Sequence, residues 1–212
     1  MEERARRIVE TAIELAEQGG FEAVRLRDVA SHAGVALGTL YRRFRSKEDL
    51  LIAALDMETL ALEKRVLQRL PRGDSPLERL TAFFAMATRG MCRRPQLARA
   101  LIRACAAGEP ALSQKVASFH GRMENLIVIS LRGKRLELLG LPSSQPGSAD
   151  AANPGRPLSD EERTLALSIQ LVWFGLLVGW SGGLHSQSAV VEQTRAAAAL
   201  MLDGAWAQSE TP

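Results

Sequence analysis

The chain has 212 residues, of which 46% are hydrophobic and 24% charged, enough for a sizeable buried core in one large domain or in a small domain joined to a larger one. Its 27 Lys and Arg against 24 Asp and Glu leave a net charge of +3, too small to predict a nucleic-acid or membrane partner from the total alone. Two cysteines exclude a disulfide framework, and the charged amino end carries no signal peptide, so we expect a cytoplasmic protein.

The composition favours helices along the whole chain. Ala and Leu are abundant, aromatic residues make up only 5% of the sequence, and runs of alternating β-branched residues are missing. We therefore predict an all-α fold, with an N-terminal three-helix helix-turn-helix domain in residues 1–47 and a C-terminal helical bundle in residues 48–212.

The first predicted helix covers residues 4–18, where apolar side chains recur at helical spacing until the Gly-Gly pair at 19–20 ends it. Arg4, Arg6 and Arg7 lie at its start, the positive end of the helix dipole, where cations are unfavourable. A nearby polyanion would give these arginines a partner, and a solvated terminal turn explains them equally well.

Residues 26–47 have the spacing of two short helices joined by a tight corner. Ala30 and Gly34 lie four residues apart, so a small side chain allows close approach and a glycine accepts the positive φ of the turn. The apolar side chains between the helices are Val29, Val35 and Leu40. Residues 25–47 contain six basic residues and one acid, a local charge of +5: Arg25, Arg27, Arg42, Arg43, Arg45 and Lys47 against Asp28. Such concentrated charge is typical of a surface that binds phosphates.

Residues 34–51, Gly-Val-Ala-Leu-Gly-Thr-Leu-Tyr-Arg-Arg-Phe-Arg-Ser-Lys-Glu-Asp-Leu-Leu, resemble the DNA-binding module of the TetR family of bacterial transcription regulators, and the resemblance extends over residues 7–55. It implies a regulator that binds a pseudo-palindromic operator as a homodimer, with ligand binding and dimerisation assigned to the C-terminal bundle. Arg25 and Ala36 depart from the family, which usually has Ser or Thr caps there. A missing cap costs about 1 kcal/mol per helix and removes a hydroxyl that often contacts phosphate.

The second helix of the motif, residues 36–44, is expected to lie in the major groove of double-stranded DNA. Leu37, Gly38 and Thr39 form the tip nearest the bases, and Tyr41 reaches a phosphate or a thymine methyl, with packing as the alternative role for its ring. The basic side chains position the protein through phosphates, and Arg27 contacts a phosphate or a base edge. The predicted DNA-binding residues are Arg27, Leu37, Gly38, Thr39, Tyr41, Arg42, Arg43 and Lys47.

A long fourth helix is predicted from a capping box of Ser46 with Asp49 to residue 70, and it joins the two domains. Pro and Gly residues then delimit three helices, over residues 76–93, 96–107 and 111–139. A Pro-, Ser- and Gly-rich loop over residues 141–158 follows and is an insertion relative to the family.

Bulky apolar side chains in these helices form either ordinary bundle core or the wall of a hydrophobic ligand cavity, and the sequence does not distinguish the two. The candidate ligand-binding residues are Phe83, Met86, Met91, Phe119, Met123, Ile127, Trp173 and Leu177.

The last two predicted helices, over residues 159–181 and 188–207, are rich in small side chains, with Gly175 and Gly179 four residues apart. We expect them to pair across a twofold axis in a homodimer, as the resemblance also implies. The apolar stretch 165–180 has 16 residues, whereas a membrane span needs about 20. Burial within the bundle and the dimer contact explain it better.

Chemistry for catalysis is not visible in the sequence. His32, His120 and His185 are scattered, and Cys92 and Cys105 have neither a CxxC spacing nor a neighbouring histidine. We expect no enzyme activity, no metal site and no cofactor. The alternatives to a DNA-binding regulator are a helical enzyme and an interaction or membrane-surface module that uses the basic stretch on anionic lipid.

Within the family, residues 93–97, 103–104 and 171–180 resemble the actinobacterial repressors of cholesterol and steroid catabolism. This resemblance implies a bulky apolar effector, such as a sterol derivative or its acyl-CoA thioester. An effector that favours a state in which the recognition helices no longer match the groove would release the operator.

Overall fold

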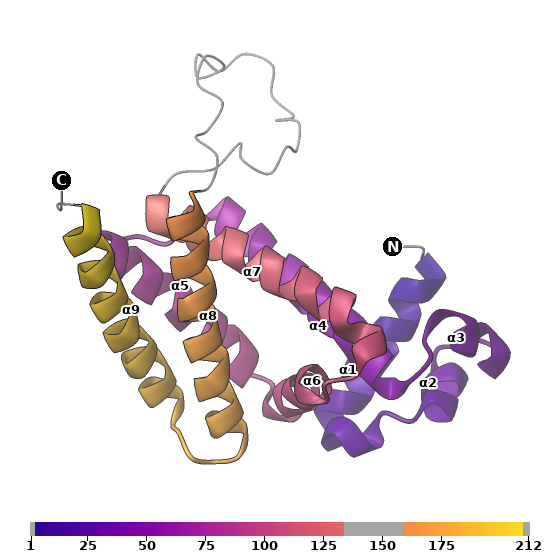
Figure 1. The fold of residues 1–212 in the computed structure, drawn as a ribbon. Coiled ribbons are helices and arrows are strands. Elements are labelled where there is room, and N and C mark those ends of the chain that lie inside the picture. The colour runs from indigo at the N-terminus through magenta and orange to yellow at the C-terminus, as the bar shows by residue number, and fades with distance from the viewer. Residues whose placement is uncertain (1–2, 134–158, 210–212) are drawn as a thin grey trace.

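The computed structural model describes residues 3–133 and 159–209, and within these ranges every regular element is a helix, which confirms the all-α prediction. The helices are α1 (Glu3–Ala23), α2 (Leu26–His32), α3 (Leu37–Arg43), α4 (Lys47–Gln68), α5 (Pro76–Cys92), α6 (Pro95–Ala106), the 3-10 helix η1 (Pro110–Leu112), α7 (Ser113–Arg132), α8 (Asp160–Ser181) and α9 (Gln187–Ser209). Figure 1 shows α2 and α3 at one end of the molecule and the paired α8 and α9 at the other, with α4 and α7 running between them.

The glycine pair in α1 breaks the helix where the sequence predicts it. Gly19 (φ −143°) and Gly20 (φ 67°) leave the helical conformation, but the chain then resumes a helical turn up to Ala23. The first helix therefore ends at the glycine pair as predicted, and a separate short turn follows it, in which Phe21 packs against the core. A side chain at Gly20 would lie 3.1 Å from Oε1 of Gln96, so the end of α1 closely approaches the start of α6.

The corner between α2 and α3 follows the predicted pattern. Gly34 takes a left-handed φ of 64°, and the Val35 N–H donates to the Ala30 carbonyl over 3.0 Å. Val29 and Leu40 are fully buried between the two helices. Neither Arg25 nor Ala36 caps its helix with a side chain, so packing holds these short helices.

The start of α4 differs from the sequence prediction in its capping. Lys47, the last residue of the predicted N-terminal domain, is the first residue of α4. Ser46 Oγ accepts from the Asp49 N–H over 3.1 Å as expected, but the Asp49 carboxylate does not return to Ser46. It accepts instead from the Arg45 N–H over 3.0 Å and pairs with Lys115 of α7. The predicted capping box is therefore incomplete, because the Asp49 carboxylate is occupied by Arg45 and Lys115.

Complete capping boxes begin α5 and α8, where Ser75 pairs with Glu78 and Ser159 with Glu162. The starts of α6 and α7 lie within two residues of their predicted positions, the shift at α7 being caused by the 3-10 turn before it. Gly133, with φ 65°, ends α7 at Arg132, short of the predicted residue 139. The predicted loop 141–158 lies outside the described residues.

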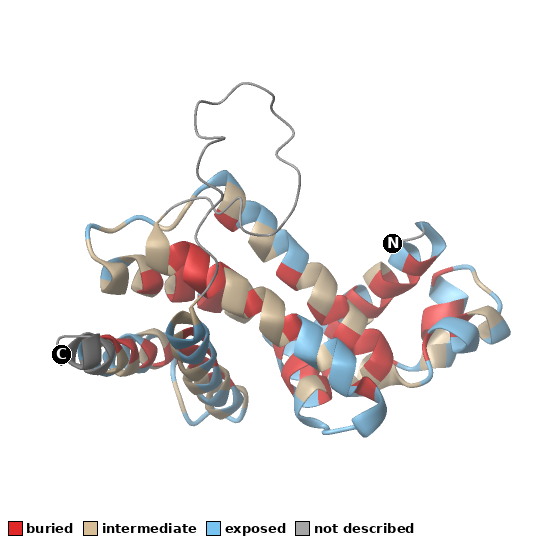
Figure 2. Ribbon diagram, turned by 45° about the horizontal axis from the view of Figure 1, so that its top comes forward, coloured by how far each residue is buried: buried red, intermediate tan, exposed pale blue. Residues whose placement is uncertain are grey.

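A continuous apolar core runs from the helix-turn-helix to the bundle. Figure 2 shows buried residues along the inner turns of the central helices and exposed residues on the outer turns. In the described part of the chain, α8 alone is long and apolar enough to cross a membrane, a test that a core helix of a soluble protein also passes. Only 28% of its apolar stretch is buried, on the face that carries Ile169, Trp173 and Leu177 and packs on α6, α7 and α9. Burial within the bundle therefore accounts for only part of the apolar stretch, contrary to the burial predicted from the sequence.

Candidate DNA-binding surface and ligand cavity

One buried side chain orients the recognition helix α3. Leu40 has no exposed surface and fixes this face of α3 against the core. The opposite face is open to solvent: the Tyr41 side chain is 52% exposed, and Gly38, Arg42 and Arg43 are exposed as well. Arg42 Nη2 donates to Thr39 Oγ1 over 3.3 Å, which steadies both side chains on that outer face.

The other predicted DNA-binding residues surround this face. Arg27 is exposed in the first turn of α2, and Leu37 is half-buried at the start of α3, where it packs against the core. A hollow between α1 and α3 is lined by Arg4, Ala5, Ile8, Thr39, Arg42 and Arg43. Arg4 thus joins the basic surface although it was not among the predicted contacts. Its place at the positive end of the first helix was the signal for it in the sequence.

Lys47 does not extend freely into solvent. Its Nζ lies 3.3 Å from a carboxylate oxygen of Glu22 and 3.9 Å from the centroid of the Phe21 ring. Arg103 of α6 shares both partners, with Nη1 2.9 Å from Glu22 and its guanidinium 4.0 Å from the Phe21 ring. The hydrogen bond and charge of Lys47, followed by Arg103, lower the pKa of Glu22. We call Phe21, Glu22, Lys47 and Arg103 the Phe21 cluster.

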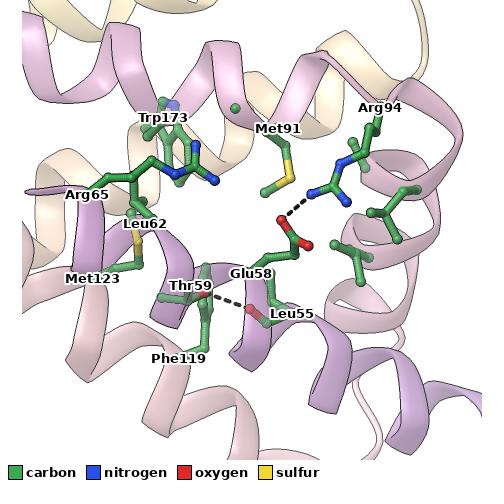
Figure 3. A pocket seen from close by; sticks show the side chains of 15 residues that line it. Leu55, Glu58, Thr59, Leu62, Arg65, Met91, Arg94, Phe119, Met123 and Trp173 are labelled. Atoms are coloured by element: carbon green, nitrogen blue, oxygen red, sulfur yellow. Dashed lines mark hydrogen bonds and ion pairs between the residues drawn. The ribbon is translucent and has the colours of Figure 1, made fainter. Parts of the chain in front are cut away.

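A small cavity lies among α4, α5, α6, α7 and α8, and Figure 3 shows its wall. One side comes from α4, through Leu55, Glu58, Thr59, Leu62 and Arg65. The facing side includes Met91, Arg94, Leu101, Phe119, Met123 and Trp173. Its volume is about 50 Å³, well below the 300–1,000 Å³ or so of a typical ligand pocket. A ligand that needs a pocket of typical size could therefore bind only if the walls of this cavity moved apart.

The structure brings some of the predicted ligand-binding residues together. Met91, Phe119, Met123 and Trp173 line the cavity, and Leu177 lines a smaller adjoining one with three of them. The remaining three candidates are not among the lining residues: Phe83 and Ile127 are buried in the core, and Met86 is half-buried against it.

Two contacts hold the cavity wall in place, and one titratable group lies beside it. Trp173 Nε1 donates to Thr88 Oγ1 over 2.9 Å, which fixes the indole ring. Phe84 packs against the same ring, with 5.7 Å between centroids. Cys105 lines the adjoining cavity, and burial raises the pKa of its thiol, so this residue contributes as an apolar side chain.

The polar residues of the wall were not anticipated from the sequence. In Figure 3, Glu58 points toward Arg94 and forms an ion pair with it, while Arg65 lies on the other side, near Trp173. These three residues come from turns of α4 and from the residue before α6, and only the folded arrangement brings them to one cavity. Among the described residues, no group of His, Cys, Asp or Glu is arranged to hold a metal ion.

Comparison with known proteins links this architecture to one group of regulators. Residues 8–54 match the family model described as bacterial regulatory proteins, tetR family. The HTH-type transcriptional repressor KstR of Rhodococcus jostii (strain RHA1) is 31% identical over 200 residues, which cover 94% of this chain and 83% of the relative. The protein of the same name from Mycobacterium tuberculosis is 30% identical over 84% of this chain and 71% of the relative.

Solved structures show the same fold. The crystal structure of a TetR transcriptional regulator from Rhodococcus sp. RHA1 superposes with a TM-score of 0.73 at 27% identity, covering 95% of this chain and 97% of the other. Thermus thermophilus FadR, a repressor solved in complex with lauroyl-CoA, superposes with a TM-score of 0.68 at 19% identity, covering 94% of each chain.

Proposed function

Because the chain belongs to the TetR family of bacterial transcription regulators, we propose that it is a cytoplasmic repressor that binds a pseudo-palindromic operator as a homodimer and is released by a hydrophobic small molecule. The observation that carries the DNA-binding part is the open basic face of α3, with Tyr41 and Arg42 exposed opposite the buried Leu40. The same relatives speak against an enzyme, since they are named as transcriptional repressors, and no finding favours a membrane-surface role.

On DNA, α3 lies in the major groove with Leu37, Gly38 and Thr39 nearest the bases and Tyr41 at a phosphate or a thymine methyl. Arg42, Arg43 and Lys47 bind phosphates, and Arg27, in the first turn of α2, contacts a phosphate or a base edge. Arg4 extends the basic surface across the hollow between α1 and α3.

The homodimer forms through α8 and α9. An exposed apolar row on α8, made by Leu167, Leu171 and Val178 with the open Gly175 between them, supports this interface. These positions recur every three or four residues, so they lie on one face of the helix. The face is free in the single chain, and a second copy would bury it, placing two recognition helices about 34 Å apart.

The effector binds in the cavity among α4, α5, α6, α7 and α8. A sterol derivative or its acyl-CoA thioester is the proposed class, supported by the apolar wall with Met91, Phe119, Met123 and Trp173 and by the resemblance to the repressors of steroid catabolism. The Thermus FadR, which has the same fold, holds lauroyl-CoA. A ligand of this size must widen a cavity of about 50 Å³, and α4 forms one side of it.

Selection from a random duplex pool with the full-length protein tests the DNA-binding part. We expect enrichment of a pseudo-palindrome whose half-sites lie about one helical turn, 10 base pairs, apart. Arg43→Ala and Lys47→Ala should weaken binding to the selected and a scrambled duplex alike, whereas Leu37→Ala and Thr39→Ala should change the preference between them. A pool without any enriched sequence would contradict the proposal.

A further inference from the structure

Arg94 forms two separate ion pairs that together link the cavity wall to α1. Its Nη1 lies 2.8 Å from Oε1 of Glu17 in α1, and its Nη2 pairs with Glu58 of α4. Glu58 and Arg94 both line the cavity, whereas Glu17 lies on α1, the first helix of the helix-turn-helix domain. One guanidinium therefore joins three helices, as its planar fork of donors allows.

Arg94 occupies an unfavourable position for a cation, which its two carboxylate partners offset. It is the residue before the first turn of α6, where the helix dipole disfavours a cation. Burial disfavours its charge further, yet Glu17 and Glu58 outweigh burial and raise its pKa. Its side chain is 35% exposed, so these pairs are only partly screened by water. The end of α1 also packs closely here, with Gly20 against Gln96.

We propose that Arg94 is a positioning residue that transmits widening of the cavity to α1, an inference that rests on the proposed DNA-binding function. In the contracted cavity, Glu58 and Arg94 face each other from α4 and α6, and Arg94 holds Glu17 (Figure 3 shows the Glu58 pair). An occupant that separates α4 from α6 breaks or bends this Glu58–Arg94–Glu17 relay. The end of α1 then loses the Arg94–Glu17 ion pair that joins it to the bundle. The N-terminal helices are then free to leave the orientation that binds DNA.

The relay is tested in the ligand-free protein by removing one carboxylate at a time. Glu58→Gln and Glu17→Gln should each weaken binding to the selected duplex by about three- to tenfold, measured by fluorescence anisotropy. Their effects should not add, and the double variant should match Arg94→Gln, because both arms act through one side chain. The salt dependence of binding should stay unchanged, since no phosphate contact is lost. Amide hydrogen exchange over residues 15–23 should speed up in all of these variants.

Glu63→Gln is the matched control. Glu63 is also on α4 and also pairs with an arginine, but that partner is Arg122 of α7, at 3.0 Å, and Glu63 does not line the cavity. Its loss should leave DNA binding within about twofold of the original, as for a structural pair without coupling. Arg94→Lys keeps the charge but offers one ammonium in place of a fork, so it should weaken DNA binding as Arg94→Gln does while remaining more stable.

Unchanged DNA affinity and unchanged exchange in a folded Glu58→Gln protein would overturn the relay, as would strictly additive effects of the two carboxylate variants. Failure of the proposed function looks different, because the unmodified protein would then select no duplex. If the unmodified protein selects no duplex, the amide exchange of residues 15–23 still tests the Glu58–Arg94–Glu17 relay, because that measurement needs no DNA.

Discussion

The two ends of the molecule form helices in different ways. At the DNA end, α2 and α3 have seven residues each, and the residues that precede them, Arg25 and Ala36, give no side-chain cap. At the far end, α8 has 22 residues and begins in a complete capping box with three acids in its first turn. Isolated helices shorter than about 12 residues are marginal in water. We therefore infer that α2 and α3 are stable because a few buried side chains pack them against the core. The rest of their surface stays exposed and can contact a partner.

The most direct test of this difference is to truncate Leu40, the buried side chain that packs α3 against the core. Leu40→Ala should lower the free energy of unfolding by about 2–5 kcal/mol, because a fully buried leucine leaves a cavity. Urea denaturation measures the change. Its neighbour Tyr41, 52% exposed, is the control: Tyr41→Ala should change stability by less than about 0.5 kcal/mol while still weakening DNA binding.

A cap removed from a capped helix tests the other half of the comparison. In α5, Ser75 Oγ accepts from the Glu78 N–H over 3.2 Å. Ser75→Ala should therefore cost about 1 kcal/mol of unfolding free energy in urea titrations. A result near zero would mean that packing alone also holds the helices of the bundle.

A cap added to an uncapped helix should act in the opposite direction. Ala36 has the extended backbone, φ −64° and ψ 138°, that a capping residue adopts. Ala36→Ser should raise the unfolding free energy by about 0.5–1 kcal/mol. The new hydroxyl also stands where the family usually contacts phosphate, so DNA binding should strengthen rather than weaken; loss of binding would show that this position needs a smaller side chain.

A substitution in the Phe21 cluster should have a smaller effect, in this case on the affinity for duplex DNA. Lys47 must leave Glu22 to bind a phosphate, so Glu22→Gln should tighten binding to any duplex by about two- to threefold at low salt. The gain should fade as salt screens the exposed charges. Glu10→Gln removes another exposed acid, one that pairs with Arg6 at 2.8 Å in the same helix, and serves as the control for a general change in charge.

The smallest effect concerns pH and lies in the bundle. His120 Nδ1 accepts from Gln170 Nε2 over 2.7 Å, and burial lowers the pKa of this histidine below its ordinary 6.5. The unfolded chain therefore binds the proton more readily, and stability should be full above about pH 6.5 and fall as the pH drops below it. Urea titrations at pH 7.5 and 5.5 should show this fall, and His120→Asn should reduce it.

Signals that act between neighbours in the sequence predicted most of the fold. Ser75, Pro76 and Glu78 begin α5 as expected, and the Gly19–Gly20 pair breaks α1 at the expected place. The short turn that follows, up to Ala23, was not predicted, because three residues are too few to show a helical spacing of apolar side chains.

The two candidate sites differ in the same way. Leu40 and the exposed residues beside it follow from helical spacing within one short segment, so the outward face of α3 was predictable. The polar part of the cavity wall was not, because Glu58 and Arg94 meet only through the packing of α4 beside α6. No local pattern distinguishes Phe83, a core residue, from Met91, which lines the cavity.

The length of α4 gives small movements a large reach. Its 22 residues, at 1.5 Å per residue, form a rod about 33 Å long. A tilt of about 5° at the bundle end would carry its first turn, where Lys47 lies, roughly 3 Å sideways by simple geometry. Successive nucleotides of a DNA strand are about 3.4 Å apart. Such a small rotation would thus shift the DNA-binding end of α4 by nearly the spacing between two successive nucleotides.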